Sequence, residues 1–310
     1  MKHISIHDIE HKVKYVPIAL PKRGASAAEL LSSFPNFLGA KDFKGVVDSI
    51  AKSHENDKEV IFAMGAHVVK VGCSPIICDL IERGIISAIS VNGAFSIHDV
   101  ELSLFGHTSE HVENGIQDGS FGMCKETVDF FREVLELEES RNITGFGDRT
   151  GQVLRSKKLV APSVIETAHR HIVPVFIHVA LGCDTIHMDP TLDFGTLGKS
   201  SMYDFQQLCE SVRNLGTWLN IGSAVILPEV FLKAVTFVRS TGLKLDDIFS
   251  ANFDMFPSYR AVQNVITRPV KEGHGLNING CHEILIPLLR QAILEHPYFG
   301  PLPMPAELKE

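Results

Sequence analysis

The stretch IISAISVNGAFSIHDVELSLFG, residues 85–106, contains the clearest indication of the fold class. It opens with a nearly continuous apolar run to Val91, which is typical of a strand covered on both faces. Asn92-Gly93 ends this run. The apolar residues that follow keep a helical spacing up to Gly106, a residue suited to ending a helix. The stretch therefore predicts a strand, a tight turn and a helix.

The same alternation recurs along the chain. Strand-like runs lie within residues 60–70, 85–91, 172–181, 217–222 and 246–253, and helix-like runs lie at 74–84, 94–106, 163–171, 201–216, 228–242 and 281–296. The helix at 74–84 is expected to have Ser74 as its N-cap and Pro75 as its first residue. The alternation predicts an α/β fold with a doubly wound, mainly parallel sheet and helices on both faces. Five or six strands are too few for an eight-unit barrel, so we expect an open sheet.

We expect three regions along the chain. Residues 1–55 form an N-terminal extension packed on the core, in which Ser26 could cap a short helix that begins at Ala27. Residues 56–296 form a single Rossmann-like α/β domain, and residues 297–310 form a C-terminal tail.

Composition limits the partners of the protein. The chain has 310 residues, of which 45% are hydrophobic, and a formal net charge of −8, so it lacks the basic surplus that nucleic acids and anionic membranes attract. It has no apolar run long enough to cross a bilayer, and its first residues form no signal peptide, so we expect a cytoplasmic protein. The six cysteines form no CxxC pair and are expected to be reduced thiols.

Polar or small residues follow the predicted strands, and in doubly wound folds ligands bind beyond the carboxyl ends of the strands. No GxGxxG fingerprint is present, but a nucleotide could bind at another exit loop. The alternative is that these loops are polar only because they lie on the surface. The candidate cofactor contacts are Gly65, Asn92, Gly93, Gly222, Ser223, Ala251 and Asn252.

The helix of the opening stretch carries polar groups among apolar ones. His98 and Glu101 are three residues apart and share a helical face, with Asp99 beside them. One interpretation is structural, with Asp99 interacting with the helix dipole and His98 capping a neighbour. The other is that His98 is a catalytic group at the mouth of a site.

A second cluster lies in FIHVALGCDTIHMDP, residues 176–190. His178 and Asp184 are candidate catalytic residues, and Cys183 lies beside Asp184. His178, His187 and Asp189 could alternatively bind a metal, although their spacing matches no strong zinc pattern. We favour a hydrogen-bonding pocket for a polar ligand over a metal site.

A third cluster lies in NFDMFPSYRAVQNVITRP, residues 252–269. Two arginines here could bind a carboxylate or phosphate through their guanidinium forks, or they could simply form surface salt bridges. The segment GHGLNINGCHE, residues 273–283, predicts a shaped loop, and one possible role for it is a lid. The candidate substrate-binding residues are Asp254, Tyr259, Arg260 and Asn264, with Arg268 as a catalytic candidate.

ISVNGAFSIHDVELSLFGHTSE (89–110) and HIVPVFIHVALGCDTIHM (171–188) resemble the deoxyhypusine synthase superfamily. The first segment is also similar to NAD-dependent ornithine cyclodeaminases of the same fold. The segments GSAVILPEVFLKA and NFDMFPSYRAVQNVITRP are similar to a bacterial branch of the superfamily. The resemblance implies a parallel-sheet NAD-binding fold and a homo-oligomer, either a tetramer or a dimer. It also implies imine chemistry, in which NAD takes hydride from a carbon bearing an amine.

The chain departs from this family in two places. Arg268 stands where deoxyhypusine synthase has the lysine that forms the imine, so deoxyhypusine formation is not expected. Lys271 lies outside the motif. Pro228-Glu229-Val230, after Ile226-Leu227, is taken as the counterpart of the family's glycine-rich turn, where side chains would obstruct a dinucleotide.

Three functions follow from these features. The leading hypothesis is an NAD-dependent transferase- or lyase-type enzyme for a small anionic substrate that bears an amine or alcohol. In it, His98 or His178 moves protons, Arg260 and Arg268 hold the anion, and Asp184 or Asp254 orients substrate or ribose. The alternatives are a metal-dependent hydrolase or lyase that uses the His/Asp cluster, and a non-catalytic ligand-binding relative.

Overall fold

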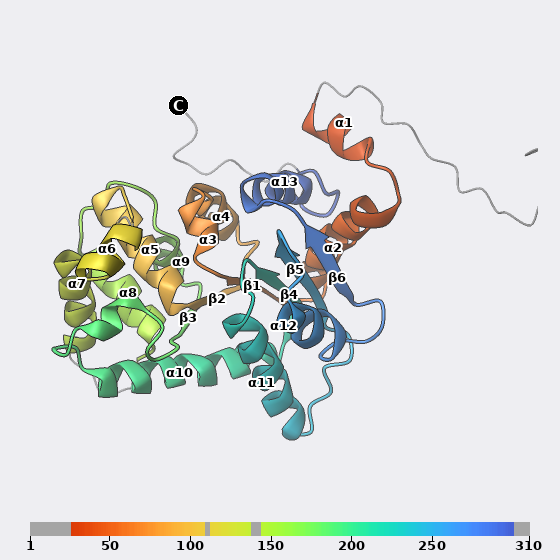
Figure 1. The fold of residues 1–310 in the computed structure, drawn as a ribbon. Coiled ribbons are helices and arrows are strands. Elements are labelled where there is room, and N and C mark those ends of the chain that lie inside the picture. Colours follow the sequence, from red (N-terminus) through yellow and green to blue (C-terminus); the bar gives the residue numbers. More distant parts are fainter. Residues whose placement is uncertain (1–25, 109–111, 138–143, 301–310) are drawn as a thin grey trace, which may run out of the picture.

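A computed structural model describes residues 26–108, 112–137 and 144–300. Parts of the predicted N-terminal extension (1–25) and C-terminal tail (301–310) lie outside these ranges. The centre of the fold is a six-stranded sheet in the order β3-β2-β1-β4-β5-β6, in which every neighbouring pair is parallel (Figure 1). The strands are β1 (Glu59–Met64), β2 (Ala88–Asn92), β3 (Val175–His178), β4 (Leu215–Ile221), β5 (Phe249–Asp254) and β6 (Gly275–Asn279).

The open parallel sheet predicted from the sequence is confirmed. Its strand order reverses between β1 and β4, which pair in register from Val60 with Thr217 to Met64 with Ile221. The chain moves outward from β1 to β3 on one side and from β4 to β6 on the other. The strand order therefore reverses at the ends of β1 and β4, the position at which doubly wound sheets bind ligands, and we call this position the crevice.

Helices cover both faces of the sheet (Figure 1). In that view α10, α11 and α12 lie below the sheet, and α2, α3, α4 and α13 lie above it, with α5 to α9 gathered at the β3 end. The helices are α1 (Ala27–Ser32), α2 (Leu38–Glu55), α3 (His67–Lys70), α4 (Ser74–Glu82), α5 (Gly93–Phe105), α6 (Val112–Asp118), α7 (Lys125–Glu136), α8 (Phe146–Arg155), α9 (Val164–Arg170), α10 (Phe194–Val212), α11 (Ile226–Ser240), α12 (Tyr259–Ala261) and α13 (His282–Leu294), with a short 3-10 helix η2 (Thr185–Met188) and a π-helix η3 (Val262–Thr267).

Each face of the sheet has its own apolar core, because alternate residues of a strand point to opposite faces. In β4, Leu219 and Ile221 join the larger core beneath α2, α4, α5 and α13. Trp218 joins the smaller core beneath α10 and α11, where its ring stacks on Phe231 with centroids 4.4 Å apart. Burial on both faces explains the continuous apolar runs of the strands.

Two helix ends behave as the sequence predicted. Gly106 ends α5 in the left-handed conformation, with φ of 75°, and its N–H bonds the carbonyl of Leu102. Ser26 caps α1, and Glu29 completes a capping box. At α4, by contrast, the N-cap is Cys73 rather than Ser74, which is already helical.

Three expectations were wrong or incomplete. Residues 275–279 form the edge strand β6 rather than a loop; the strand is only partly buried and so lacks an apolar run. Ile226-Leu227 are the first turn of α11, not the end of a strand, so Pro228 lies within a helix and the turn after β4 is Gly222-Ser223. The helices α6, α7 and α8 had no predicted counterpart.

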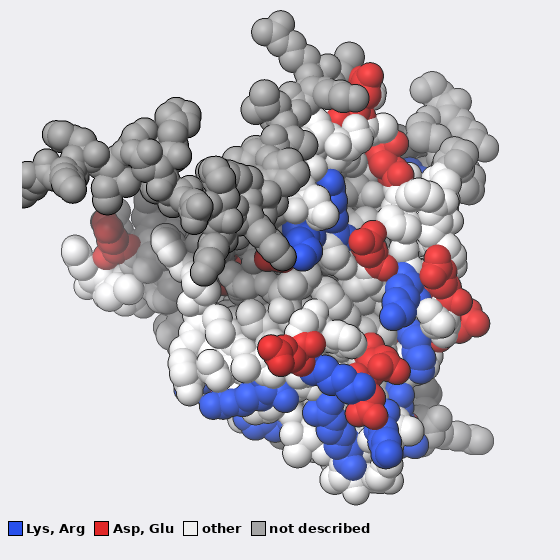
Figure 2. Space-filling view, turned by 90° about the vertical axis from the view of Figure 1, so that its right-hand side faces the viewer, with Lys and Arg blue, Asp and Glu red and all other residues white. Residues whose placement is uncertain are grey.

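No helix in the described ranges is both long and apolar enough to cross a membrane. Figure 2 views the molecule from the side of α2 and β6. On that face Lys and Arg side chains are interspersed with Asp and Glu, so charges of both signs alternate.

Candidate functional site

Polar side chains form a row across the carboxyl-terminal half of the sheet. Asn220, Asn252 and Asn277 are in register on β4, β5 and β6. Asn220 donates to Asn252 Oδ1 and Asn252 donates to Asn277 Oδ1, each at 2.8 Å. The buried Oδ1 of Asn220 has no hydrogen-bond partner among the described residues. The row therefore links three strands close to the crevice.

Two glycines bring the exits of β1 and β4 into contact at this crevice. A Cβ on Gly65 would lie 2.1 Å from the carbonyl oxygen of Gly222, so only glycine fits there. Gly222 itself has φ of 64°, a left-handed conformation that favours glycine. Ser223 Oγ then accepts a hydrogen bond from the N–H of Leu227 in the first turn of α11. These contacts leave the start of α11 directly beside the crevice.

A cavity of about 440 Å³ lies beyond the ends of β2 and β3. Its walls come from α3, α5, α6, the start of α7, and the loop that follows β3. Both charged and apolar side chains line it, which suits a small polar ligand with a carbon skeleton. The lining residues are Lys70, Ala94, Ile97, His98, Glu101, Phe105, His107, Thr108, Val112, Phe121, Gly122, Cys124, Thr127, Cys183, Asp184, Thr185 and Ile186.

Glu101 is the centre of a hydrogen-bond network in this cavity. His98 Nδ1 lies 3.1 Å from Glu101 Oε2, Thr108 donates to the same oxygen, and Thr127 donates to Oε1 at 3.0 Å. Burial alone would raise the pKa of Glu101, but these hydrogen bonds hold it below its ordinary value. A carboxylate only accepts, so His98 Nδ1 carries the proton and Nε2 of the neutral ring is a proton acceptor.

Asp99, the neighbour of His98, has a structural role. Its buried carboxylate accepts hydrogen bonds from Ser163 Oγ at 2.6 Å and from the backbone N–H groups of Val164 and Ile165. It thereby satisfies the free amides at the start of α9 and ties α9 to α5. Each interpretation of α5 therefore holds for some of its residues. Asp99 has the structural role, because it caps α9, while His98 and Glu101 line the cavity.

Asp184 lies in the cavity wall against the first turn of α5. A Cβ on Gly93 would be 2.0 Å from Asp184 Oδ2. Burial raises the pKa of Asp184 to about 6, although the charge of His98 opposes the shift. His187 Nδ1 accepts from the N–H groups of Gly182 and Asp184, so its proton is on Nε2, which lies 3.9 Å from Asp184 Oδ2.

His178 is not in the lining of this cavity. It is 6% exposed and its Nε2 lies 3.0 Å from Ser90 Oγ on β2. Burial lowers its pKa to about 3, so the ring is neutral near pH 7. Asp189, the third residue of the metal hypothesis, accepts from Thr191. No cluster of three potential ligands for a metal occurs within the described ranges.

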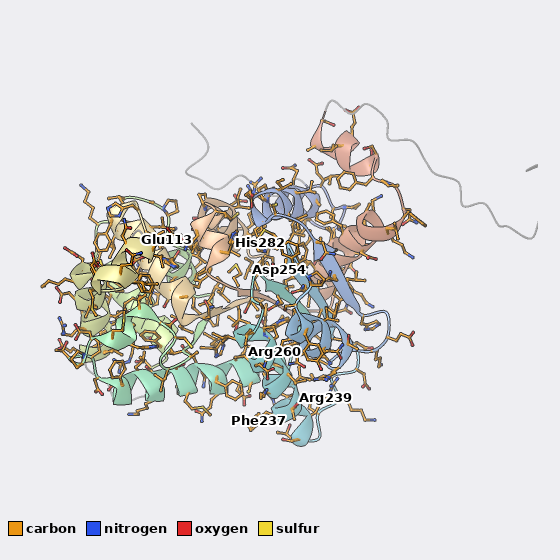
Figure 3. The ribbon with its side chains drawn as sticks, viewed as in Figure 1. Glu113, Phe237, Arg239, Asp254, Arg260 and His282 are labelled. Carbon is orange, nitrogen blue, oxygen red and sulfur yellow. The ribbon has the colours of Figure 1, made fainter. Side chains whose placement is uncertain are left out.

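The predicted anion-binding residues form a separate network around Glu229 of α11. Arg260 Nε and Asn264 Nδ2 donate to Glu229 Oε1 at 3.1 and 2.9 Å. Arg268 donates to Asn264 Oδ1 and to the hydroxyl of Tyr259. Figure 3 shows Arg260 beside α11 and α12, well apart from Glu113 of α6.

The other residues predicted to contact a cofactor or substrate do not lie together in one site. Gly93 lies in the first turn of α5 against Asp184 of the cavity wall, and Asn92 Oδ1 caps α5 through the N–H of Phe95. Ala251 is buried in the core within β5, and Asp254 ends that strand, where its Oδ1 accepts from the N–H of Met255. The structure thus brings together His98 and Asp184, but not His178 or Arg268.

Several cavity residues were missed in the sequence. Lys70 lies in the short helix α3, and Thr127 begins the buried face of α7. A signal for α7 was present, because Val128, Phe131 and Leu135 keep a helical spacing of apolar residues. No local pattern indicates that Thr127 reaches Glu101, since that contact depends on how α7 packs on α5.

Comparison with known proteins places the fold in a class. A family model described as arginine dihydrolase ArgZ-like, C-terminal, Rossmann fold matches residues 44–120. Unliganded AgrE resembles the structure with a TM-score of 0.57 at 12% identity, covering 81% of this chain and 32% of that chain. A putative deoxyhypusine synthase from Entamoeba histolytica has a TM-score of 0.52 at 12% identity, covering 87% and 93%. No curated protein matches the sequence.

A third similar structure is the ternary complex of AgrE with ornithine and NAD+, with a TM-score of 0.53 at 14% identity, covering 82% of this chain and 33% of that chain. The chain spans about a third of the length of the AgrE chains it matches. At these identities the likeness is one of fold. The protein thus has a Rossmann-type α/β fold, as its sequence predicted, and this fold is similar to those of AgrE and of the putative deoxyhypusine synthase.

Proposed function

We propose that this protein is an NAD-dependent enzyme that acts on a small substrate bearing an amine or alcohol, bound in the cavity beyond β2 and β3. One observation carries the proposal: His98 and Glu101 of α5 line one cavity together with Asp184 from the loop after β3. Such a group can accept a proton and bind a cation in the same space. The ternary complex of AgrE, a protein of similar fold, contains ornithine and NAD+.

The crevice between β1 and β4 has features that fit a dinucleotide. Gly65 and Gly222 carry no side chains where the exits of β1 and β4 pack together, and α11 starts at Ile226, three residues after Ser223. A helix start next to small residues favours a phosphate group. The expected obstruction by Pro228 does not arise, because that residue lies in α11. When bound, NAD supplies a hydride acceptor for the carbon that bears the amine or alcohol.

His98 is the group that we propose accepts the substrate proton. Glu101 holds its Nδ1–H, which leaves Nε2 free to take a proton from the amine or alcohol. The ionised Glu101 carboxylate also stabilises the imidazolium that results. We assign this role to His98 rather than to His178, because His178 lies outside the cavity and burial lowers its pKa to about 3, so that its ring resists protonation.

Charges around the cavity suggest how the substrate is held. Asp184, with a pKa of about 6, is largely ionised at neutral pH and can bind an ammonium group. Lys70 lines the cavity with an exposed side chain and offers a cation for a carboxylate. An amino acid carries both of these groups. We therefore propose an amino acid, or a closely related amine, as the substrate class.

Arg260 and Arg268 are less suited to the anion-binding role than their sequence motif indicated. Their guanidinium groups bond Glu229, Asn264 and Tyr259, none of which lines the cavity. The metal-dependent alternative loses support as well, because His178, His187 and Asp189 contact separate partners. A homo-oligomer remains our expectation from the family resemblance.

Turnover in the presence of NAD tests this proposal. The full chain is incubated with NAD and a panel of small amino acids, amines and hydroxy acids. Products and ammonia are followed by mass spectrometry, because hydride returned within the cycle leaves no net NADH. We expect His98→Gln to lower turnover by about 100-fold or more while NAD still binds. His54→Gln on α2 is the control. Unchanged turnover in His98→Gln would contradict the assignment.

A further inference from the structure

Two histidines meet at the crevice between β1 and β4. His67 is the first residue of α3, directly after the β1 exit, and His282 is the first residue of α13. Their Nδ1 atoms lie 3.2 Å apart, within hydrogen-bond distance. His282 is 1% exposed, whereas His67 is only half-buried. In Figure 3 His282 lies beside Asp254, near the end of β5.

The partners of His282 determine which nitrogen carries its proton. Its Nε2 lies 3.2 Å from the carbonyl oxygen of Phe253, and a carbonyl can only accept. Nε2 therefore carries the hydrogen, and Nδ1 of the neutral ring is an acceptor. Because that nitrogen faces Nδ1 of His67, the hydrogen between the rings belongs to His67. The neutral ring of His67 then has an unprotonated Nε2.

The ring of His282 is held in place by the β4 exit. A Cβ on Gly222 would lie 2.9 Å from His282 Cε1, so the ring packs against the glycine backbone. The carbonyl of Phe253 that accepts from His282 also accepts from the N–H of Gly222 at 2.9 Å. The orientation of His282 is therefore coupled to the backbone that shapes the crevice.

We infer that His67 is a hydrogen-bond acceptor for a ligand in the crevice, and that the buried His282 is the positioning residue that fixes its tautomer. An unprotonated Nε2 selects a donor, such as a ribose hydroxyl, and disfavours a carboxylate or phosphate at the same point. This inference rests on the proposed function for the identity of the ligand, a dinucleotide. The tautomer of His67 does not depend on that proposal.

Histidine tautomers are measured on the full chain labelled with 15N-histidine, by long-range proton–nitrogen correlation at a pH where the rings are neutral. We expect the Nδ1–H form for His67 and the Nε2–H form for His282. Resonances are assigned by loss of signal in His67→Gln and His282→Gln. His274, whose Nδ1 lies 3.3 Å from the carbonyl of Ile248, is the control residue, and His274→Gln is the control variant. An Nε2–H form of His67 in the unmodified protein would overturn the inference.

The proposed contact between His67 and the ligand is tested separately, by measuring the affinity for NADH. His282→Phe keeps a ring of similar size but removes both the donor to Phe253 and the acceptor that orients His67. We expect this variant to show a mixture of His67 tautomers and to bind NADH about three- to ten-fold more weakly. Equal affinity would overturn the ligand contact. If the unmodified protein binds no NADH, the proposed function fails, while the tautomer result still decides whether His282 positions His67.

Discussion

Asp184 occupies the space that a side chain on Gly93 would need, since a Cβ there would lie 2.0 Å from its carboxylate oxygen. The two residues are far apart in sequence, one in the first turn of α5 and the other in the loop after β3. Their contact holds a carboxylate at the start of a helix, where the helix dipole favours negative charge. The cavity therefore depends on a glycine at position 93.

Gly93→Ala is predicted to displace Asp184. We expect a loss of about 1–3 kcal/mol in the free energy of unfolding, because the added methyl group meets a buried carboxylate. Weaker binding of a cationic substrate should accompany it. Denaturant unfolding and substrate titration measure the two effects.

The matched control for that variant is Gly198→Ala. Gly198 lies within α10, and a Cβ there meets nothing within 4 Å. Alanine favours a helix over glycine, so this variant should be more stable by about 1 kcal/mol. If Gly93→Ala also stabilised the protein and left binding intact, the proposed contact with Asp184 would be wrong.

His178 is predicted to make the protein sensitive to acid. Burial lowers its pKa from 6.5 to about 3, so the unfolded chain binds a proton at a higher pH than the folded chain does. Its contribution to stability is therefore complete above pH 6.5 and is lost progressively as the pH falls toward 3. Between pH 7 and pH 5 the loss is about 2 kcal/mol.

Unfolding of the wild-type protein and of His178→Phe at several pH values measures this contribution. Phenylalanine loses the hydrogen bond to Ser90 but cannot titrate, so the stability difference between the two proteins should shift in favour of the variant as the pH falls. Parallel stability curves for the two proteins across this range would show that His178 is not buried as described.

Substitutions of Lys70 and of the two arginines are predicted to have different effects on the substrate. Lys70 lines the cavity, whereas Arg260 and Arg268 do not. Lys70→Gln should raise KM about 10- to 100-fold for a substrate with a carboxylate, as loss of a charged hydrogen bond would. Arg260→Gln and Arg268→Gln should leave KM nearly unchanged. A raised KM in the arginine variants, with an unchanged KM in Lys70→Gln, would show that the arginines bind the substrate carboxylate.

The fold could be predicted because its signals are local. Apolar runs such as 85–91 indicate strands buried on both faces, and Gly106 ends its helix through its own backbone conformation. The edge strand β6 was missed because only one of its residues, Ile278, is buried. An edge strand pairs through its backbone, which leaves little trace in the side chains.

The candidate site was predicted only in part, because it depends on contacts between distant segments. His98 and Asp184 were both chosen from polar residues near strand ends, and the parallel sheet brings them to one cavity. The arginines were chosen for their chemistry alone, and the sequence could not indicate that Glu229, on another helix, binds Arg260. Long-range packing decides such partners.

NADH titration, followed by energy transfer from tryptophan, tests whether the protein binds a dinucleotide at the crevice between β1 and β4. The chain has one tryptophan, Trp218, which is buried in β4 at the strand-order reversal. NADH bound at that crevice should quench Trp218 emission and gain emission of its own, with saturation below the millimolar range. Trp218→Phe should bind NADH without this signal. If NADH produces no saturable change in the wild-type protein, and calorimetry detects no binding, the account of an NAD-dependent enzyme is contradicted.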